Sequence, residues 1–459
     1  MKYAVIVCGA GPTGTAAAIA AARKLREHGH EKKVLLLERY GFGGGMATGA
    51  LVNPWAGHQY FEAGTSKVGS LIGGLFKEIN SLLCQAGGFG STLTQGAFDE
   101  ERLKLVYDQL LQGAGVDILY HTTVTGVERE GRKITAVYTS SKEGSRAFYG
   151  DTIIDATGDG DLAAAAGCEW SLGRQSDQMT QAMTVSFRVG NVDKQAMIAD
   201  LVRLGQSGHK SARMLVEPYF QKAIAEGRLH YPHREWVHFY DHPQPGILHF
   251  NMTRINQRNG LSAKDLTYAE MEGRRQAFVF ADWLKQDVPY FKDSYLEKVA
   301  FQIGVRETRH VKGLYTMTAD DITNAAKFDD AIVRSRYFID IHSPTGSGFD
   351  HENITGYGAV AKNFDVPDGD YYEVPYRAIV PVGIDNLLVP CRALSATHEA
   401  AAAIRVMATM TGMGEAAGLA AAQSVERNLP FNEIDTARLR SQLNYLDEQP
   451  DYGYPWNIN

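Results

Sequence analysis

Arginine and histidine side chains in two short segments are candidates for chemistry on a small anionic molecule. The segment "GVRETRHVKG" contains Arg306 and Arg309, and "SATHEAAAAIRVM" contains His398 and Arg405. Arginine suits a carboxylate because its planar fork matches the two oxygens. Histidine titrates near neutral pH and can act as a general acid or base. His398 and Arg405 are seven residues apart, about two helical turns, so on a helix both could face one pocket.

Each of these assignments has a structural alternative. Arg306 and Arg309 share a side on a helix but face opposite sides in a strand. We expect at least one of them to contact a substrate and the other to pair with Glu307 or Glu352; the alternative is a solvated face of ion pairs. His398 could equally cap a helix or lie in the core.

Two further segments add candidates. "RYFIDIHSPTG" places Asp340 and His342 on one face of an expected strand, where Asp340 could orient His342 for catalysis or the pair could be structural. "NPWAGH" places Trp55 and His58 after a glycine-rich loop. Trp55 is a candidate pocket wall, although a large aromatic side chain more often belongs to the core.

The N-terminal segment predicts the element that positions these groups around a nucleotide. Residues 3–8 form an apolar β-rich run, an alanine-rich helix follows the glycine turn, and residues 33–38 predict a second buried parallel strand. Glu38 lies 24 residues after Gly14, close to the ~20 residues expected for the acid that binds ribose hydroxyls. A pyrophosphate would then lie on the first amides of the helix. The residues expected to hold it are Gly9, Gly11, Pro12, Thr13 and Gly14. The alternative is an ordinary strand–helix–strand unit with a glycine turn.

The loop after Glu38, "RYGFGGGMATG", favours FAD over NAD. A loose segment of small residues can lie along an extended cofactor and offer amides to its pyrophosphate and ribityl chain. A flexible surface loop is the alternative. The loop residues expected to bind the cofactor are Arg39, Gly44, Gly45, Met46, Ala47 and Thr48.

Three later segments fit the same domain. A helix over 99–111 leads to a strand over 117–120 and an antiparallel meander over 124–129 and 134–139, with Val124 near the cofactor. A strand over 152–155 ends in the small residues Ala156, Thr157 and Gly158, which permit close approach of a dinucleotide.

Near the C-terminal end, a strand over 386–389 precedes a helical stretch, a break at "TGMGEAAG" and a last helix. The amides at the start of that last helix would face the flavin carbonyl edge. The residues concerned are Met413, Gly414, Glu415 and Ala416.

On these motifs ("GAGPTG", "GFGGGMATG", "DATGDGDLA", "GVRETRHVKG" and the segment from Cys391 to "AAGLAAA") the chain resembles FAD-dependent oxidoreductases of the glutathione-reductase-like fold, distantly similar to fumarate reductase flavoprotein subunits. The resemblance implies an α/β fold: a discontinuous Rossmann-like FAD-binding domain (a parallel sheet with an antiparallel meander) over 1–167 and 371–459, with an α+β substrate domain inserted over 168–370. Covalent attachment in some relatives uses a histidine in the loop after the ribose acid. Residues 39–57 contain none, so we expect noncovalent FAD.

Composition excludes several classes. The 459 residues carry a net charge of −7, which argues against nucleic acid or an anionic membrane as a main partner. The four cysteines are far apart and form no C-x-x-C, which argues against a disulfide framework, a metal site or a redox pair. A stretch long enough to span a membrane is lacking, and Lys2 opens a structural strand rather than a signal peptide. We therefore expect a cytoplasmic protein. A second G-x-G-x-x-G motif is also lacking, which argues against a separate NAD(P)H domain.

The sequence thus predicts an FAD-dependent dehydrogenase or reductase that moves hydride between flavin N5 and a small anionic organic substrate, with an unidentified electron acceptor. Two alternatives remain: a flavoprotein without net redox turnover, as in some hydratases, and an FAD-binding regulatory subunit. The aromatic tail "YGYPWNIN" is expected to pack on a neighbouring surface or subunit, which is compatible with a homo-oligomer.

Overall fold

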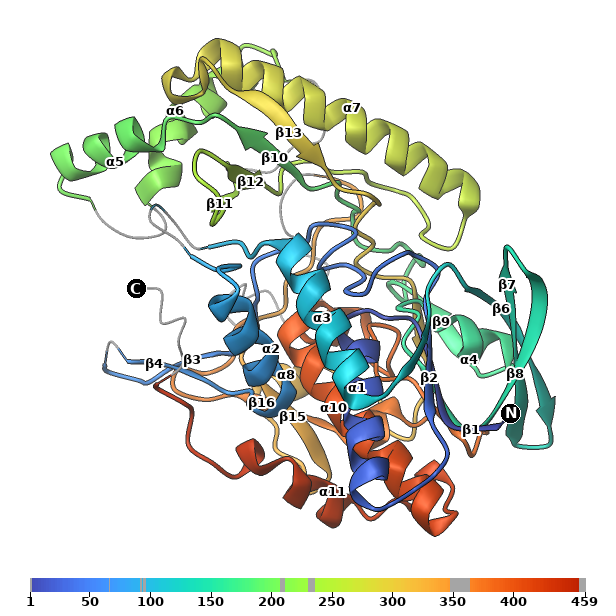
Figure 1. Ribbon diagram of the computed structural model, residues 1–459. Coiled ribbons are helices and arrows are strands. Elements are labelled where there is room, and N and C mark those ends of the chain that lie inside the picture. The colour runs from blue at the N-terminus through green and yellow to red at the C-terminus, as the bar shows by residue number, and fades with distance from the viewer. Residues whose placement is uncertain are drawn as a thin grey trace.

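The larger body contains a seven-stranded mixed sheet, whose strands β1, β2, β6, β7 and β8 lie on the right-hand side of Figure 1. The computed structural model describes residues 2–453 except 66, 91–92, 94–95, 207–210, 230–235 and 347–363. The strand order is β5-β2-β1-β8-β7-β6, and β17 pairs with β8. β1, β2, β5, β17 and the end of β8 run parallel, whereas β6, β7 and the start of β8 form an antiparallel meander. The predicted α/β fold is confirmed. The strands are β1 (Lys2–Cys8), β2 (Val34–Leu37), β5 (Asp117–Leu119), β6 (Thr123–Glu130), β7 (Lys133–Ser141), β8 (Gly144–Asp155) and β17 (Leu387–Leu388).

Helices α1 (Pro12–Glu27) and α10 (Met407–Arg427) lie side by side against this sheet (Figure 1). Their contact is unusually close because glycines face backbone. A Cβ on Gly414 would overlap the carbonyl of Thr13, and one on Gly418 would overlap the carbonyl of Ala17. The predicted helix break at "TGMGEAAG" is therefore wrong. These glycines lie inside one continuous helix, where they allow close packing.

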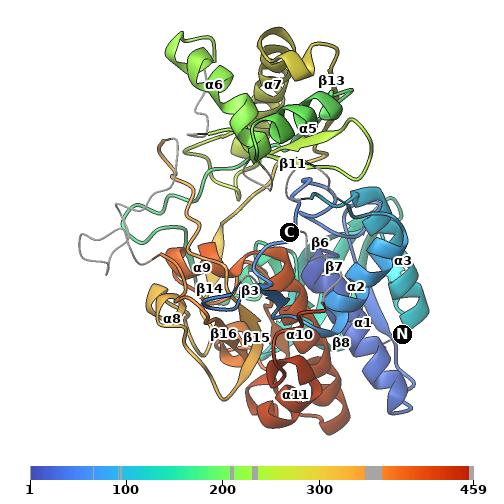
Figure 2. The ribbon, with the colours of Figure 1, turned by 90° about the vertical axis from the view of Figure 1, so that its left-hand side faces the viewer.

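A second, four-stranded antiparallel sheet forms a separate layer with its own helices (Figure 2). Its order is β11-β12-β10-β13. Alternate residues such as Phe187 and Phe250 point into an apolar core shared with the three helices, whereas Arg188 and His249 point the other way. The elements are β10 (Phe187–Gly190), α5 (Lys194–Arg203), α6 (Ser211–Ala225), β11 (Phe239–Asp241), β12 (Leu248–Phe250), α7 (Ala263–Asp287) and β13 (Tyr295–Val299).

The second core is built from a shorter stretch than the inserted domain predicted over 168–370. Its buried residues lie mainly between Phe187 and Phe291, whereas Met317, Ile332 and Val374 belong to the core of the larger body. β15 (Ala331–Ser335) pairs with β16 (Tyr372–Pro375) in that larger body. The chain therefore returns from the second sheet well before residue 370.

Smaller elements complete the larger body. Helix α3 begins after Asp99, whose carboxylate accepts hydrogen bonds from the amides of Glu101 and Arg102, and Gly115 ends the helix in a left-handed conformation. In the described part of the chain, the helices are too short or too polar to cross a membrane. The remaining elements are β3 (Gln59–Phe61), β4 (Val68–Ser70), α2 (Gly74–Gln85), α3 (Glu100–Ala114), α4 (Asp161–Ala165), β9 (Trp170–Leu172), β14 (Arg309–Val311), α8 (Ala319–Thr323), α9 (His398–Ile404) and α11 (Thr436–Gln442), with 3-10 turns at Pro289–Phe291, Tyr376–Ile379, Phe431–Glu433 and Asn444–Leu446.

Candidate active site

One cavity of about 550 Å³ runs from the end of β1 to the second sheet. At one end it is lined by the glycine turn before α1, and at the other by residues of β11 and β12. Ligands of parallel α/β sheets bind at the carboxyl ends of the strands. The cavity therefore joins the expected nucleotide position to the polar face of the second sheet.

The glycine turn leaves room for a phosphate at the start of α1. Gly9 adopts a φ of +96°, and a Cβ there would overlap the carbonyl of Ala156. Gly11 is the N-cap of α1 and makes no side-chain cap, and a Cβ on it would enter open space. The first amides of α1 are thus available to an anion, as at other helix N-termini.

Glu38 lies beside this turn, as the sequence predicts. Its carboxylate accepts hydrogen bonds from the amides of Ala10 (2.7 Å) and Tyr40 (2.9 Å), and it lines the cavity. Burial raises the pKa of Glu38, although both amides oppose the rise. A carboxylate has about four acceptor positions, so two amides leave capacity for ribose hydroxyls.

The triple glycine bends the loop back onto the turn. Gly44 and Gly45 adopt φ values of +108° and +48°, and the amide of Gly44 donates to the carbonyl of Ala10 (2.6 Å). A Cβ on Gly45 would lie 2.9 Å from Cα of Gly11. The glycines therefore allow two backbone segments to meet at one end of the cavity.

The cavity is lined by only part of the predicted cofactor set. The residues that line it are Gly9, Gly11, Pro12, Thr13, Glu38, Arg39, Gly45, Met46, Ala156, Thr157 and Gly158. The other predicted cofactor residues lie outside the lining and contact neighbouring parts of the chain. Gly14 packs on Gly9, Thr48 donates to the carbonyl of Gly43 (2.7 Å), and Val124 packs against the apolar core on the other side of the sheet. Gly44 and Ala47 also lie outside the lining.

The predicted contact of the C-terminal helix with the cofactor requires correction. Met413, Gly414, Glu415 and Ala416 lie more than one turn inside α10 and do not line the cavity. The helix begins at Met407, and the lining residues are Val406, Met407 and Met410.

Arg405 ends helix α9 and reaches the cavity. Its guanidinium Nη2 donates to the Asp340 carbonyl (3.1 Å), to Oδ2 of Asp340 (3.3 Å) and to Oε1 of Gln181 (3.3 Å). The Tyr337 hydroxyl also donates to Asp340 Oδ2 (2.9 Å). Burial and Asp340 raise the pKa of Tyr337 well above its ordinary value. Asp340 therefore holds Arg405 in place.

His342 lines the cavity beside Asp340, but both ring nitrogens are engaged. Nε2 lies 3.3 Å from Asp340 Oδ1, and Nδ1 lies 3.2 Å from Nη2 of Arg254. An arginine can only donate, so Nδ1 must accept and the ring proton lies on Nε2. This tautomer suits His342 to positioning rather than to proton transfer.

His398 and Arg309 do not reach the cavity. His398 is buried, and its Nδ1 donates to Glu307 Oε1 (2.7 Å), which also receives a hydrogen bond from Nε2 of His310 (2.9 Å). Arg309 donates to the Asp159 carbonyl and to Asp161, both at 2.8 Å. Glu307 thus pairs with histidines rather than with an arginine, and Glu352 lies outside the described residues.

Arg306 does line the cavity, where it donates to the carbonyl of Ala182 and to the Thr184 hydroxyl (2.8 Å). Trp55 also lines it but is 3% exposed and packs between Phe76 and Phe98. His58 lies outside the lining, and burial lowers its pKa to about 4, so it is neutral.

The sequence analysis missed the wall formed by the second sheet. Tyr240 and His249 are directly opposite each other on β11 and β12, and both line the cavity with Ser186 and Asn251. The Tyr240 hydroxyl lacks a hydrogen-bond partner among the described residues, and Arg213 lies over its ring (5.1 Å). Burial and the nearby Arg188 hold the pKa of His249 well below its ordinary value. The alternating patterns "HFYD" and "LHFN" were the available signal.

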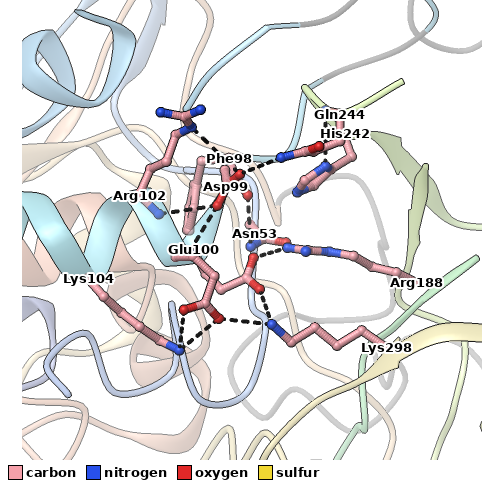
Figure 3. A network of polar contacts seen from close by, with 11 residues as sticks. Asn53, Phe98, Asp99, Glu100, Arg102, Lys104, Arg188, His242, Gln244 and Lys298 are labelled. Carbon is pink, nitrogen blue, oxygen red and sulfur yellow. Dashed lines mark hydrogen bonds and ion pairs between the residues drawn. The ribbon is translucent and has the colours of Figure 1, made fainter. Parts of the chain in front are cut away.

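A buried cluster of ion pairs links the second sheet, which forms this wall, to the larger body (Figure 3). Glu100, fully buried at the start of α3, pairs with Arg188 of β10 and with Lys298 of β13 (2.8 Å). Gln244 donates to Asp99 (3.3 Å) at the same junction. The cluster sets where the polar wall lies relative to the glycine turn.

Comparison with known proteins establishes the family. Residues 4–443 match the family described as FAD dependent oxidoreductase. The chain belongs to this family. No curated protein matches the sequence. The resemblance to FAD-dependent oxidoreductases predicted above is thus confirmed.

Several solved structures are similar to this FAD-dependent oxidoreductase at low identity. The flavin-dependent brominase Bmp2 is 12% identical with a TM-score of 0.46, and the match covers 97% of this chain and 84% of that chain. A geranylgeranyl bacteriochlorophyll reductase-like protein from Thermoplasma acidophilum is 12% identical with a TM-score of 0.41, covering 97% and 83%. BexE is 14% identical with a TM-score of 0.39, covering 69% and 55%, so the chain matches about half of that relative. At TM-scores below 0.5, none of these likenesses bears on the reaction.

The residues around the glycine turn fit the FAD that the family implies. The uncapped N-terminus of α1 suits a pyrophosphate, and Glu38 retains acceptor capacity for a ribose. The same cavity is also lined by Arg39, Met46 and Arg405.

Proposed function

We propose that this FAD-dependent oxidoreductase is a dehydrogenase or reductase that holds FAD noncovalently and acts on a small anionic organic substrate. The observation that carries the proposal is the continuity of one cavity from the glycine turn to Arg405 and Arg306. Bound FAD would supply the hydride acceptor or donor. The chain's own residues then need to bind the substrate, orient it and manage one proton.

The charge of the cavity favours an anionic substrate. Its lining contains six arginines and three carboxylates. The cofactor pyrophosphate and a substrate carboxylate would together offset much of this positive excess. Arg405 and Arg306 project from different elements towards the same cavity, so they can hold a carboxylate from two directions.

Tyr240 is the group we assign to proton transfer. His398 lies outside the cavity lining, and both nitrogens of His342 are occupied. Tyr240, in contrast, lines the cavity, and its hydroxyl has no hydrogen-bond partner among the described residues, so this hydroxyl can donate to or accept from a bound substrate. Arg213 lies over the Tyr240 ring (5.1 Å).

Noncovalent binding is supported by the nucleophiles near the cavity. Residues 39–57 contain no histidine, and His58 does not line the cavity. Cys391 does line it, but burial raises the pKa of its thiol to about 12. A thiol in this state is a poor nucleophile for attachment to a flavin.

The experiment is the visible spectrum of the purified protein before and after acid precipitation, followed by anaerobic mixing with carboxylates, amines and alcohols. Flavin released into the supernatant supports noncovalent FAD, and bleaching by one compound identifies the substrate class. Flavin retained in the pellet would contradict noncovalent binding. A flavin that no compound bleaches would favour the non-redox alternative.

A further inference from the structure

A buried group of three titratable side chains lies directly behind the cavity and takes no part in the proposed chemistry. Glu307, His310 and His398 are 2%, 5% and 4% exposed. Both imidazoles donate to Oε1 of Glu307, at 2.9 and 2.7 Å. We call these three residues the Glu307 cluster. A buried carboxylate is costly unless it is fully hydrogen-bonded, so its second oxygen needs a donor as well.

That second donor connects the Glu307 cluster to the cavity. Oε2 of Glu307 accepts from the backbone amide of Gln181 (2.9 Å). The side-chain Oε1 of the same glutamine accepts from Arg405 Nη2 (3.3 Å) and from the amide of His342 (3.4 Å). Gln181 is 1% exposed. One buried residue thus bridges the Glu307 cluster and two groups of the cavity wall.

Helix α9 provides a second connection to the same guanidinium. His398 is its first residue and Arg405 is its C-cap. The helix between them is short and is buried except at the partly exposed Glu399; Ala400, Ala402 and Ala403 are each 0% exposed. A displacement of His398 would therefore be transmitted through a rigid segment to Arg405.

Electrostatics favours the charged forms of Glu307 and His398. Burial alone would lower the pKa of His398, but the charge and hydrogen bond of Glu307 outweigh it and raise the pKa. Burial would likewise raise the pKa of Glu307, but His398 and His310 hold it well below its ordinary range. Glu399 also favours the charged form of His398, whereas Arg174 opposes it. Glu307 therefore stays an anion and accepts strong hydrogen bonds from its donors.

We propose that Glu307 is a positioning residue for Arg405, acting through Gln181 and through helix α9. The inference rests on the proposed function only in assigning Arg405 to a substrate anion. The placement of Arg405 can be tested without a substrate. Arg405 in turn would set where a carboxylate lies in the cavity.

The first test follows the Arg405 side chain in the FAD-loaded protein labelled with ¹⁵N-arginine. The Nε–H signal of Arg405 is assigned by its loss in Arg405→Lys. The Arg405 Nε atom is buried in the structure, so its proton should exchange slowly with water. Gln181→Met and Glu307→Gln should each speed this exchange about tenfold or more, because they release the guanidinium from one side.

A matched control separates positioning from general destabilisation. Gln423 is another buried glutamine, 3% exposed, which binds the backbone of Asp435 far along α10. Gln423→Met should leave the Arg405 signal unchanged. Unchanged exchange in both Gln181→Met and Glu307→Gln would overturn the proposal, as would an equal change in Gln423→Met.

Variants of His398 keep the proposal testable if Glu307→Gln does not fold. Asparagine can place an amide donor near the Nδ1 position, whereas leucine cannot. His398→Asn should therefore retain slow exchange at Arg405, and His398→Leu should lose it. Equal behaviour of the two variants would contradict the role of the hydrogen bond to Glu307. If Arg405 responds as expected but no compound bleaches the flavin, the proposed function fails while the positioning role stands.

Discussion

Replacement of Arg188 by methionine should weaken the attachment of the second sheet to the larger body. Glu100 has no exposed surface, and its two cationic partners differ: Arg188 is 4% exposed, whereas the Lys298 side chain is 36% exposed and is shared with Glu101. Removing one partner of a buried ion pair costs about 3–5 kcal/mol. Because Lys298 still neutralises part of the charge, we expect a loss near the lower end, about 3 kcal/mol. Lys298→Met should cost at most about 1 kcal/mol, because its pair with Glu100 is screened by solvent.

The double variant Glu100→Met/Arg188→Met tests the cause. It removes the buried charge as well as its partner, and such replacements are often neutral or stabilising. We expect its stability to lie within about 1 kcal/mol of the wild type. The assay is urea unfolding at pH 7, followed by tryptophan fluorescence. A loss below about 1 kcal/mol in Arg188→Met, or equal losses in the single and double variants, would refute the reasoning.

The acid dependence of stability gives an independent check on the same cluster. Burial alone would raise the pKa of Glu100, but Arg188 and Lys298 together hold it below its ordinary value of 4.5. A lowered folded-state pKa adds stability that is present above the unfolded value and is lost as pH falls through the folded value. Arg188→Met should reduce this loss of stability below pH 4.5, because the folded-state pKa of Glu100 then moves towards or above its unfolded-state pKa. An identical acid profile in both proteins would contradict this.

Three further substitutions and one control substitution test the cavity. Glu38→Ala should lower FAD occupancy of the purified protein, because the acceptor beside the glycine turn is lost; unchanged occupancy would remove Glu38 from ribose binding. Arg405→Ala should leave FAD bound but reduce the rate of flavin bleaching by a carboxylate about 100-fold or more. The control Arg309→Ala removes an arginine outside the cavity lining and should change the rate little. Equal losses of rate in the two variants would place the substrate elsewhere. Tyr240→Phe should lower the bleaching rate about 100-fold with little change in substrate affinity, and an unchanged rate would exclude Tyr240 as the proton carrier.

Local patterns predicted the fold around the glycine turn well. The strand, glycine turn, helix and second strand lie where the sequence predicted them. The spacing of Gly9, Gly11 and Gly14, together with an acid after a buried strand, is typical of one local geometry. The prediction failed at Gly414, where a glycine that permits helix contact was interpreted as a helix break. Sequence spacing cannot distinguish these two uses of glycine, since the contacted backbone at Thr13 comes from the other end of the chain.

The far end of the cavity depended on pairings that the sequence does not encode locally. His398 and Arg405 fit a shared helical face by spacing, but helix α9 ends at Ile404, and His398 points to Glu307 instead. Tyr240 lies on a strand of three residues, too short for its alternation to stand out. Its position in the cavity becomes visible only once β11 and β12 pair.

The close contact of α1 with α10 also bears on when the cofactor can be loaded during biosynthesis. Helix α1, whose first amides we assign to a cofactor phosphate, is made early on the ribosome, whereas α10, which packs against it, is made near the end. Until Gly414 and Gly418 reach the backbone of α1, one side of that helix is exposed and its N-terminus lacks a fixed support. Flavin capture is thus expected to follow translation of both segments, and a nascent chain stalled before α10 should emerge without bound cofactor.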